Sequence, residues 1–86
     1  MEKSKFIEYI FIRNIPEFNR EIRFSHKFNE PVDFEIAKNF LINGLLLDDS
    51  TECVDWRKRN KIPEFITKYG ILEKEIKKWN IKGINR

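Results

Sequence analysis

The chain has 86 residues, of which 41% are hydrophobic and 36% are charged, and its formal net charge is +3. A chain this short has room for one hydrophobic core, so we expect a single domain over residues 1–86 that folds rather than remaining disordered. One Cys and one His exclude an internal disulfide and a zinc site of ordinary ligand spacing, and we expect neither a metal nor a cofactor.

The first apolar stretch is interrupted at Glu8, which is typical neither of a signal peptide nor of a membrane span. We therefore expect a cytoplasmic protein. The composition, with 13 Ile, 11 Lys and a single Ala, indicates an AT-rich genome, as in some bacteria and their phages.

The N-terminal third predicts a β-hairpin. Phe6–Arg13 is apolar on both faces, which indicates a central strand. After a connection that contains Pro16, Arg20–Phe28 alternates between apolar and polar residues, so one face of this second strand is covered. The apolar positions are Ile22, Phe24, His26 and Phe28. The short connection predicts antiparallel pairing. We interpret His26 as structural, because no carboxylate or nucleophile is spaced to assist it.

A helix is predicted to begin at Pro31 or Asp33 and to pack on the sheet. Its apolar stripe consists of Ile36, Ala37, Phe40, Leu41 and Leu45. Two endings remain open: the helix stops at Asn43-Gly44 and residues 45–47 form a short strand or connection, or it continues through a final turn. Residues 48–52 are expected to form a solvated acidic loop, because they lack the ligand pattern of a calcium loop.

Charge is divided sharply along the chain. Residues 31–55 carry a net charge of −5, and residues 56–86 carry +7. The basic third predicts a polyanionic partner, most simply nucleic acid. The alternative is that the acidic middle folds against the basic end and neutralises it.

The basic third begins with Trp56-Arg57-Lys58-Arg59-Asn60-Lys61, a cationic run beside an aromatic residue that suits phosphate contact and stacking. Pro63 and Gly70 then bracket a predicted short helix. Leu72, Ile76 and Trp79 predict a second helix of similar length. The sheet-packing helix, the N-terminal antiparallel β-hairpin and this C-terminal helical hairpin together predict an α+β fold.

The segment Ile-Pro-Glu-Phe-Ile-Thr-Lys-Tyr-Gly-Ile-Leu-Glu-Lys-Glu-Ile-Lys-Lys-Trp resembles the helix-turn-helix unit of bacterial DNA-binding proteins, especially the resolvase-like and transposase-like varieties. The resemblance covers residues 62–81. It implies that the second helix enters the major groove, where Glu73, Lys74, Lys77 and Lys78 contact bases or phosphates.

We therefore predict a small DNA-binding regulator or accessory factor, in which the N-terminal strands supply core or homodimer contacts. The predicted nucleic-acid contacts are Arg57, Lys58, Arg59, Lys61, Lys74, Lys77 and Lys78. We expect no enzymatic activity, because no nucleophile–base pair, paired-acid motif or glycine-rich phosphate loop is evident.

Two other interpretations remain open. The first is a phage-type protein inhibitor of a host nucleic-acid enzyme, with an anti-defence role, whose acidic surface imitates phosphate. That surface would consist of Asp48, Asp49, Glu52 and Asp55. The second is an ordinary helical hairpin whose lysines are solvated, with favourable pairs Glu64–Lys68 and Glu73–Lys77.

Overall fold

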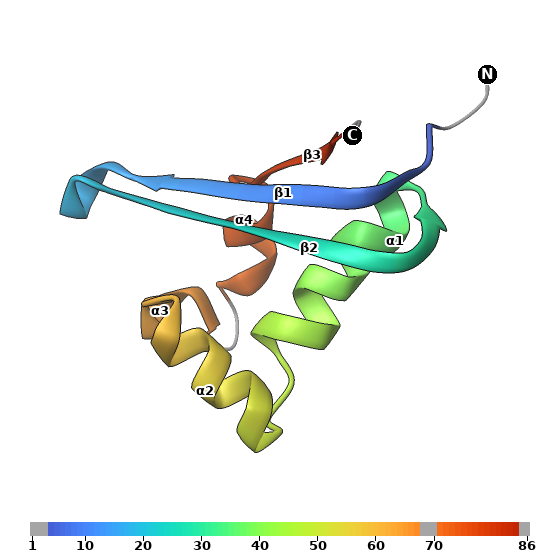
Figure 1. Ribbon diagram of the computed structural model, residues 1–86. Helices are drawn as coiled ribbons and strands as arrows, with labels where there is room; N and C mark the ends of the chain where they lie inside the picture. The colour runs from blue at the N-terminus through green and yellow to red at the C-terminus, as the bar shows by residue number, and fades with distance from the viewer. Residues whose placement is uncertain (1–3, 68–70, 85–86) are drawn as a thin grey trace.

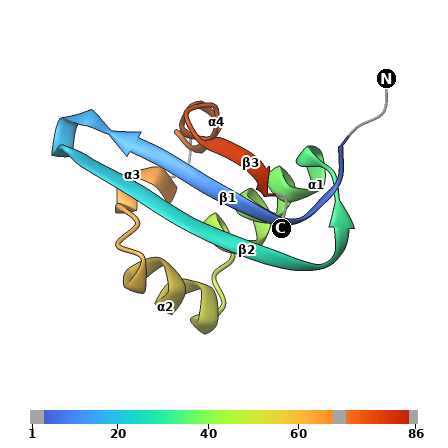
Figure 2. The ribbon, with the colours of Figure 1, turned by 45° about the horizontal axis from the view of Figure 1, so that its top comes forward.

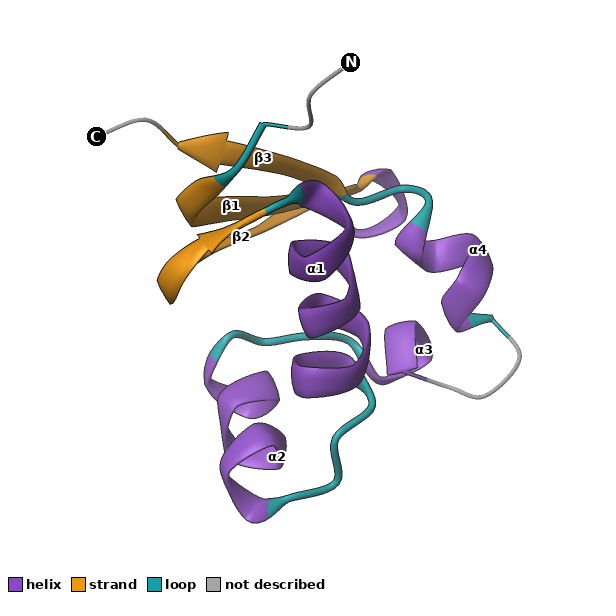
Figure 3. Ribbon diagram, turned by 90° about the vertical axis from the view of Figure 1, so that its right-hand side faces the viewer, coloured by secondary structure: helices purple, strands orange, loops and turns teal. Residues whose placement is uncertain are grey.

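Three antiparallel strands in the order β2-β1-β3 form a sheet, and helices cover one of its faces (Figures 1 and 3). The computed structural model describes residues 4–67 and 71–84. The elements in chain order are β1 (Phe6–Ile15), a 3₁₀ turn (Pro16–Phe18), β2 (Arg20–Val32), α1 (Phe34–Asn39), a π-helix (Phe40–Leu46), α2 (Thr51–Arg59), α3 (Glu64–Thr67), α4 (Leu72–Ile76) and β3 (Asn80–Ile84). The α+β fold predicted from the sequence is confirmed.

The β1–β2 hairpin is the longest feature of the sheet (Figure 2). The turn between its strands places Asn19 in the left-handed region (φ 48°), where its backbone N–H donates to the carbonyl of Pro16. Asn tolerates this conformation better than most residues do. Pairing is regular from Ile15 opposite Arg20 to Glu8 opposite Lys27, after which an irregularity shifts the register. Both strands extend beyond their predicted ends, and β1 is central as predicted.

The third strand, β3, was not predicted, and the helix expected to reach Trp79 ends at Ile76 instead. Residues 80–84 pair with Glu8–Ile12 on the free side of β1. The sequence of these five residues is too weak a pattern to indicate a strand, because only two of them are apolar, Ile81 and Ile84. A Cβ at Gly83 would collide with the ring of Phe6, so glycine allows the two strand ends to pack closely.

Alternate residues of β1 face the helices and form the centre of the core. Tyr9, Phe11 and Ile15 are buried there, together with Leu41 of the π-helix and Ile66 of α3. Such alternation follows from the two-residue period of a strand. None of the helices that the structure describes lies over the opposite face of the sheet (Figure 3).

The first helix begins at Phe34, and the Asp33 carboxylate caps it by accepting a hydrogen bond of 3.0 Å from the N–H of Ile36. The cap at Asp33 is one of the two predicted starts. The helix passes Asn43-Gly44 and continues as a π-helix, so the final-turn alternative is correct and the short strand is wrong. Ile36 does not belong to the apolar stripe: it is 49% exposed, because the neighbouring Ala37 takes the buried face.

The predicted acidic loop is shorter than expected. The hydroxyl of Ser50 accepts a hydrogen bond from the N–H of Cys53 and caps α2, so Thr51 and Glu52 are helical. Helix α4 has only five residues and is shorter than predicted. Helix α3 is described over Glu64–Thr67, and the next three residues lie outside the described part of the chain. Gly70, the predicted turn residue, lies outside the described residues.

One ion pair is buried in the core. Arg13, near the C-terminal end of β1, has its Nε donating to Glu75 of α4. A second bond joins Nη2 of Arg13 to Oε2 of Glu75 at 3.4 Å, and both residues are only 5% exposed. This pair ties α4 to the sheet.

Candidate nucleic-acid interface

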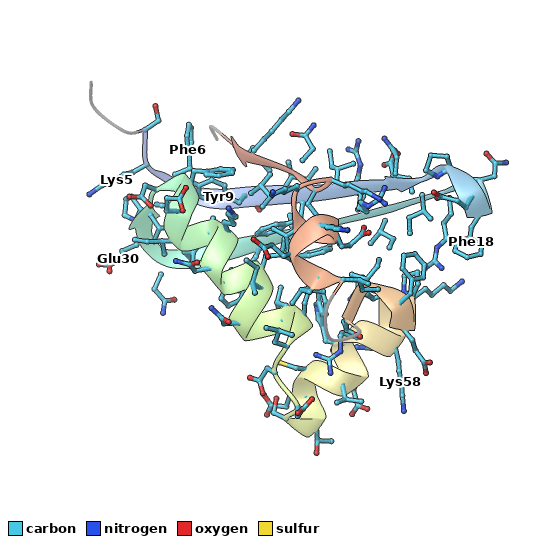
Figure 4. All side chains as sticks on the ribbon, turned by 180° about the vertical axis from the view of Figure 1, so that it is seen from behind. Lys5, Phe6, Tyr9, Phe18, Glu30 and Lys58 are labelled. Carbon is cyan, nitrogen blue, oxygen red and sulfur yellow. The ribbon has the colours of Figure 1, made fainter. Side chains whose placement is uncertain are left out.

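The helix α2 is acidic in its first half and basic in its second half. Glu52 lies in its first turn, and its last turn contains Arg57, Lys58 and Arg59. This order complements the helix dipole, so it stabilises the helix whether or not a ligand binds. Lys58 and Arg59 are exposed, and Figure 4 shows Lys58 pointing away from the sheet.

Lys61 extends the cationic end of α2. It has φ 55°, and its carbonyl accepts a hydrogen bond from Nη2 of Arg20 in β2. Arg20 thus fixes the turn after α2 and adds a charge that the sequence prediction missed. No local pattern joins two residues 41 positions apart, so only the fold reveals this contact. We call Lys58, Arg59, Lys61 and Arg20 the α2 cationic end.

Arg57 has a different environment from its basic neighbours. It is half-buried, and its Nη1 donates hydrogen bonds of 2.7 Å to the carbonyls of Leu45 and Asp48. These carbonyls lie at and just after the end of the π-helix, where backbone acceptors lack helical partners. Arg57 therefore holds α2 against the π-helix, and this contact occupies part of its guanidinium.

The other predicted cations lie on and just after α4. Lys74, Lys77 and Lys78 are exposed, while Ile76 and Trp79 are buried and anchor the segment. Glu73, which the resemblance also implies as a contact, is exposed on the same short helix.

The seven predicted contacts do not form one cluster in the structure. Three of them lie at the α2 cationic end, three lie on or after α4, and Arg57 is turned inward. The short helix α3 lies between the two exposed groups along the chain and packs against α4. The two groups therefore suit an extended polyanion better than a single small anion.

Of the predicted acidic residues, Asp48 is held by a hydrogen bond within the loop before α2. The Asp48 carboxylate accepts a hydrogen bond of 2.9 Å from the N–H of Ser50, and this backbone bond is the main reason that the pKa of Asp48 is lowered, with Arg57 adding to the effect. Asp49, Glu52 and Asp55 are exposed at three-residue spacing. The ion pairs Arg13–Glu75 and Arg23–Glu21 lie elsewhere and do not join the acidic middle to the basic end.

The single His and the single Cys, which are residue types common in catalytic and metal sites, both make packing or backbone contacts here. His26 packs against the rings of Phe28 and Phe40, and partial burial lowers its pKa below the ordinary 6.5. The thiol of Cys53 donates to the carbonyl of Gly44 at 3.1 Å. Residues 4–67 and 71–84 contain no group of three or more His, Cys, Asp or Glu placed to hold a metal ion.

Comparisons of the chain with models of protein families, with curated proteins and with solved structures found no match. Among the helices that the structure describes, none combines the length and the apolar character needed to cross a membrane.

Proposed function

We propose that this protein binds duplex DNA through phosphate contacts made by exposed cations of its helical layer. The observation that carries the proposal is the excess of exposed positive charge from residue 58 to residue 79 of the described chain. Six Lys and Arg side chains are exposed there against two carboxylates, Glu64 and Glu73. These cations are Lys58, Arg59, Lys61, Lys74, Lys77 and Lys78.

The dimensions of α4 favour phosphate contact over base reading. Five helical residues span only about 7.5 Å, whereas the major groove is about 12 Å wide and 8.5 Å deep. Phosphate contacts position a protein on DNA without reading its sequence. The resemblance of residues 62–81 to a helix-turn-helix unit adds support for a DNA partner, and a cytoplasmic location belongs to the same proposal.

The experiment compares variants that each lose two positive charges. Lys58→Ala/Arg59→Ala removes charge from the α2 cationic end, and Lys74→Ala/Lys78→Ala removes it from the α4 group. The matched control, Lys27→Ala/Lys82→Ala, removes two exposed cations from the face of the sheet that no helix covers.

Affinity for a short labelled duplex is measured by fluorescence anisotropy as a function of salt concentration. Each lost phosphate contact reduces the log–log salt slope by about 0.9, so each helical-layer variant should lose up to about 1.8. The control should retain the parental slope. Equal losses in all three variants would show that net charge, rather than this surface, governs binding, and would contradict the proposal.

A second candidate function is a protein inhibitor that imitates nucleic acid. It is favoured by three exposed carboxylates at the start of α2. Glu52 and Asp55, three apart, lie on one side of the helix, and Asp49 lies in the loop just before it. Asp49→Lys/Asp55→Lys separates the two functions. Under the DNA proposal this variant binds DNA as well as the parent or better, because repulsion of phosphates is removed. A folded variant that keeps its DNA affinity but loses biological activity would favour the inhibitor.

A further inference from the structure

A groove of about 480 Å³ runs along the helical layer between the first helical segment and α4. One wall is formed by α1 and the π-helix, which contribute Lys38 and Ile42, and by Leu47 directly after the π-helix. The other wall is formed by α4 and the residue after it. Leu72, Glu73, Ile76 and Lys77 line this second wall. The volume lies within the range of ligand sites, and the lining is largely apolar.

The two walls run in opposite directions. From the sheet, α1 and the π-helix lead away towards α2, whereas α4 leads back towards β3 (Figures 1 and 4). The end of the groove nearer the sheet therefore contains both lysines: Lys38 lies early on the first wall, and Lys77 lies at the end of the second. Leu47 and Leu72 belong to the far end. Glu73, in the first turn of α4, precedes Lys77 by about one helical turn and lies towards the far end.

This arrangement places the two lysines at one end of the groove and the two leucines, with Glu73 beside them, at the other. Leu47 is 45% exposed, so the far end presents a large apolar side chain to water. An exposed apolar surface bordered by charge commonly marks a binding site. A partner helix with acidic residues along its length would match this surface less well, because it would bring carboxylates near Glu73.

We propose that the groove binds a single-chain aliphatic carboxylate, with the carboxylate between Lys38 and Lys77 and the chain extending over Ile42 and Ile76 towards Leu47. The volume of about 480 Å³ is within the range of small-ligand sites and accommodates a medium-length fatty acid. The proposal does not depend on DNA binding, because its ligand has no phosphate and two of its deciding residues, Lys38 and Leu47, are not among the DNA contacts.

The test uses dodecanoate below its micelle concentration and follows binding through amide chemical shifts of the intact protein. We expect saturable shifts that map to Ile42, Leu47, Leu72 and Ile76. Dodecyltrimethylammonium, which has the same chain and the opposite charge, should bind at least tenfold more weakly. Absence of saturable shifts with dodecanoate, loss of the native spectrum in their place, or equal binding of both amphiphiles would overturn the proposal.

Variants distinguish the groove from general attraction to a cationic protein. Lys38→Glu/Lys77→Glu should weaken dodecanoate binding at least tenfold, whereas Lys58→Glu/Arg59→Glu, with the same change in charge outside the groove, should bind as the parent does. Leu47→Asp, at a half-exposed position that tolerates a polar residue, should also weaken it. An unchanged affinity in the folded Lys38→Glu/Lys77→Glu variant would refute the proposed head-group site.

Two other occupants would appear in the same experiment. Groove shifts that depend on protein concentration alone would identify a second copy of the chain. Tight binding of an acidic amphipathic peptide, without binding of dodecanoate, would identify a protein partner. Either result would overturn the fatty-acid proposal, and neither depends on whether the protein binds DNA.

Discussion

The buried ion pair between Arg13 and Glu75 should make α4 sensitive to a single conservative substitution. Glu75→Gln keeps the size of the side chain but leaves the Arg13 guanidinium without its counter-charge in the core. Breaking a buried pair in this way typically costs about 3–5 kcal/mol, because desolvation of the remaining charge is no longer offset.

That cost is large for this chain. A domain of 86 residues has a free energy of unfolding of roughly 4–13 kcal/mol at about 0.05–0.15 kcal/mol per residue. Each kcal/mol lowers the Tm of a domain this small by about 4–8 °C, so Glu75→Gln should lower it by roughly 12–40 °C. Glu73→Ala is the matched control, since Glu73 is exposed on the same helix and its loss should change stability by about 0.5 kcal/mol or less.

Thermal and urea denaturation followed by circular dichroism measure these effects. The double variant Arg13→Met/Glu75→Leu replaces both charges with apolar groups of similar size, and we expect it to be more stable than Glu75→Gln. A Glu75→Gln protein that melts within a few degrees of the Glu73→Ala control would refute the reasoning, because it would mean that the pair is solvated or contributes nothing.

Three further predictions concern single residues. Trp79→Ala should lower the free energy of unfolding by about 3–5 kcal/mol. Trp79→Phe should lower it clearly less, because the buried Nε1 of Trp79 has no hydrogen-bond partner among the described residues; equal urea midpoints would contradict this. Arg57→Ala should cost about 1–3 kcal/mol by leaving two carbonyls unpaired, while Arg59→Ala should melt like the parent. Burial lowers the pKa of His26, so as the pH falls below 6.5 the unfolded chain takes up a proton before the folded chain does, and stability should decrease. The Tm measured from pH 7 down to about pH 5 should therefore fall less in His26→Phe than in the parent.

The hairpin could be predicted from the sequence because its pattern is local. Two strands and their pairing follow from local patterns alone: the apolar run over Phe6–Arg13 and the alternation of apolar and polar residues over Arg20–Phe28. A strand that is central in its sheet needs a partner on each side, so the prediction for β1 already required a third strand.

The C-terminal segments could not be predicted in this way because tertiary contacts determine them. Residues 80–84 become a strand by pairing with β1 rather than through their own propensity. Helix α4 ends early for the same reason, since the chain must turn at Trp79 to reach the sheet. A helix as short as α4 depends on packing rather than on helical propensity.

The candidate interface was predicted in composition but not in detail. In the basic run, the sequence does not by itself show which cation turns inward. With the cap at Ser50 known, the helical period places Cys53, Trp56 and Arg57 on the less exposed side of α2, and it leaves Lys58 and Arg59 outside. The contact from Arg20 to the Lys61 carbonyl and the groove beside α4 needed the fold, because each joins distant parts of the chain.

The salt dependence of binding to duplex DNA tests the central proposal most directly. If the exposed cations of the helical layer engage about four phosphates, a plot of log affinity against log salt concentration should be linear with a slope near −3.6. Binding should be readily detected at about 50 mM salt, where screening is weak. A parent protein that retains no duplex under those conditions, or that binds with a slope near zero, would contradict the account.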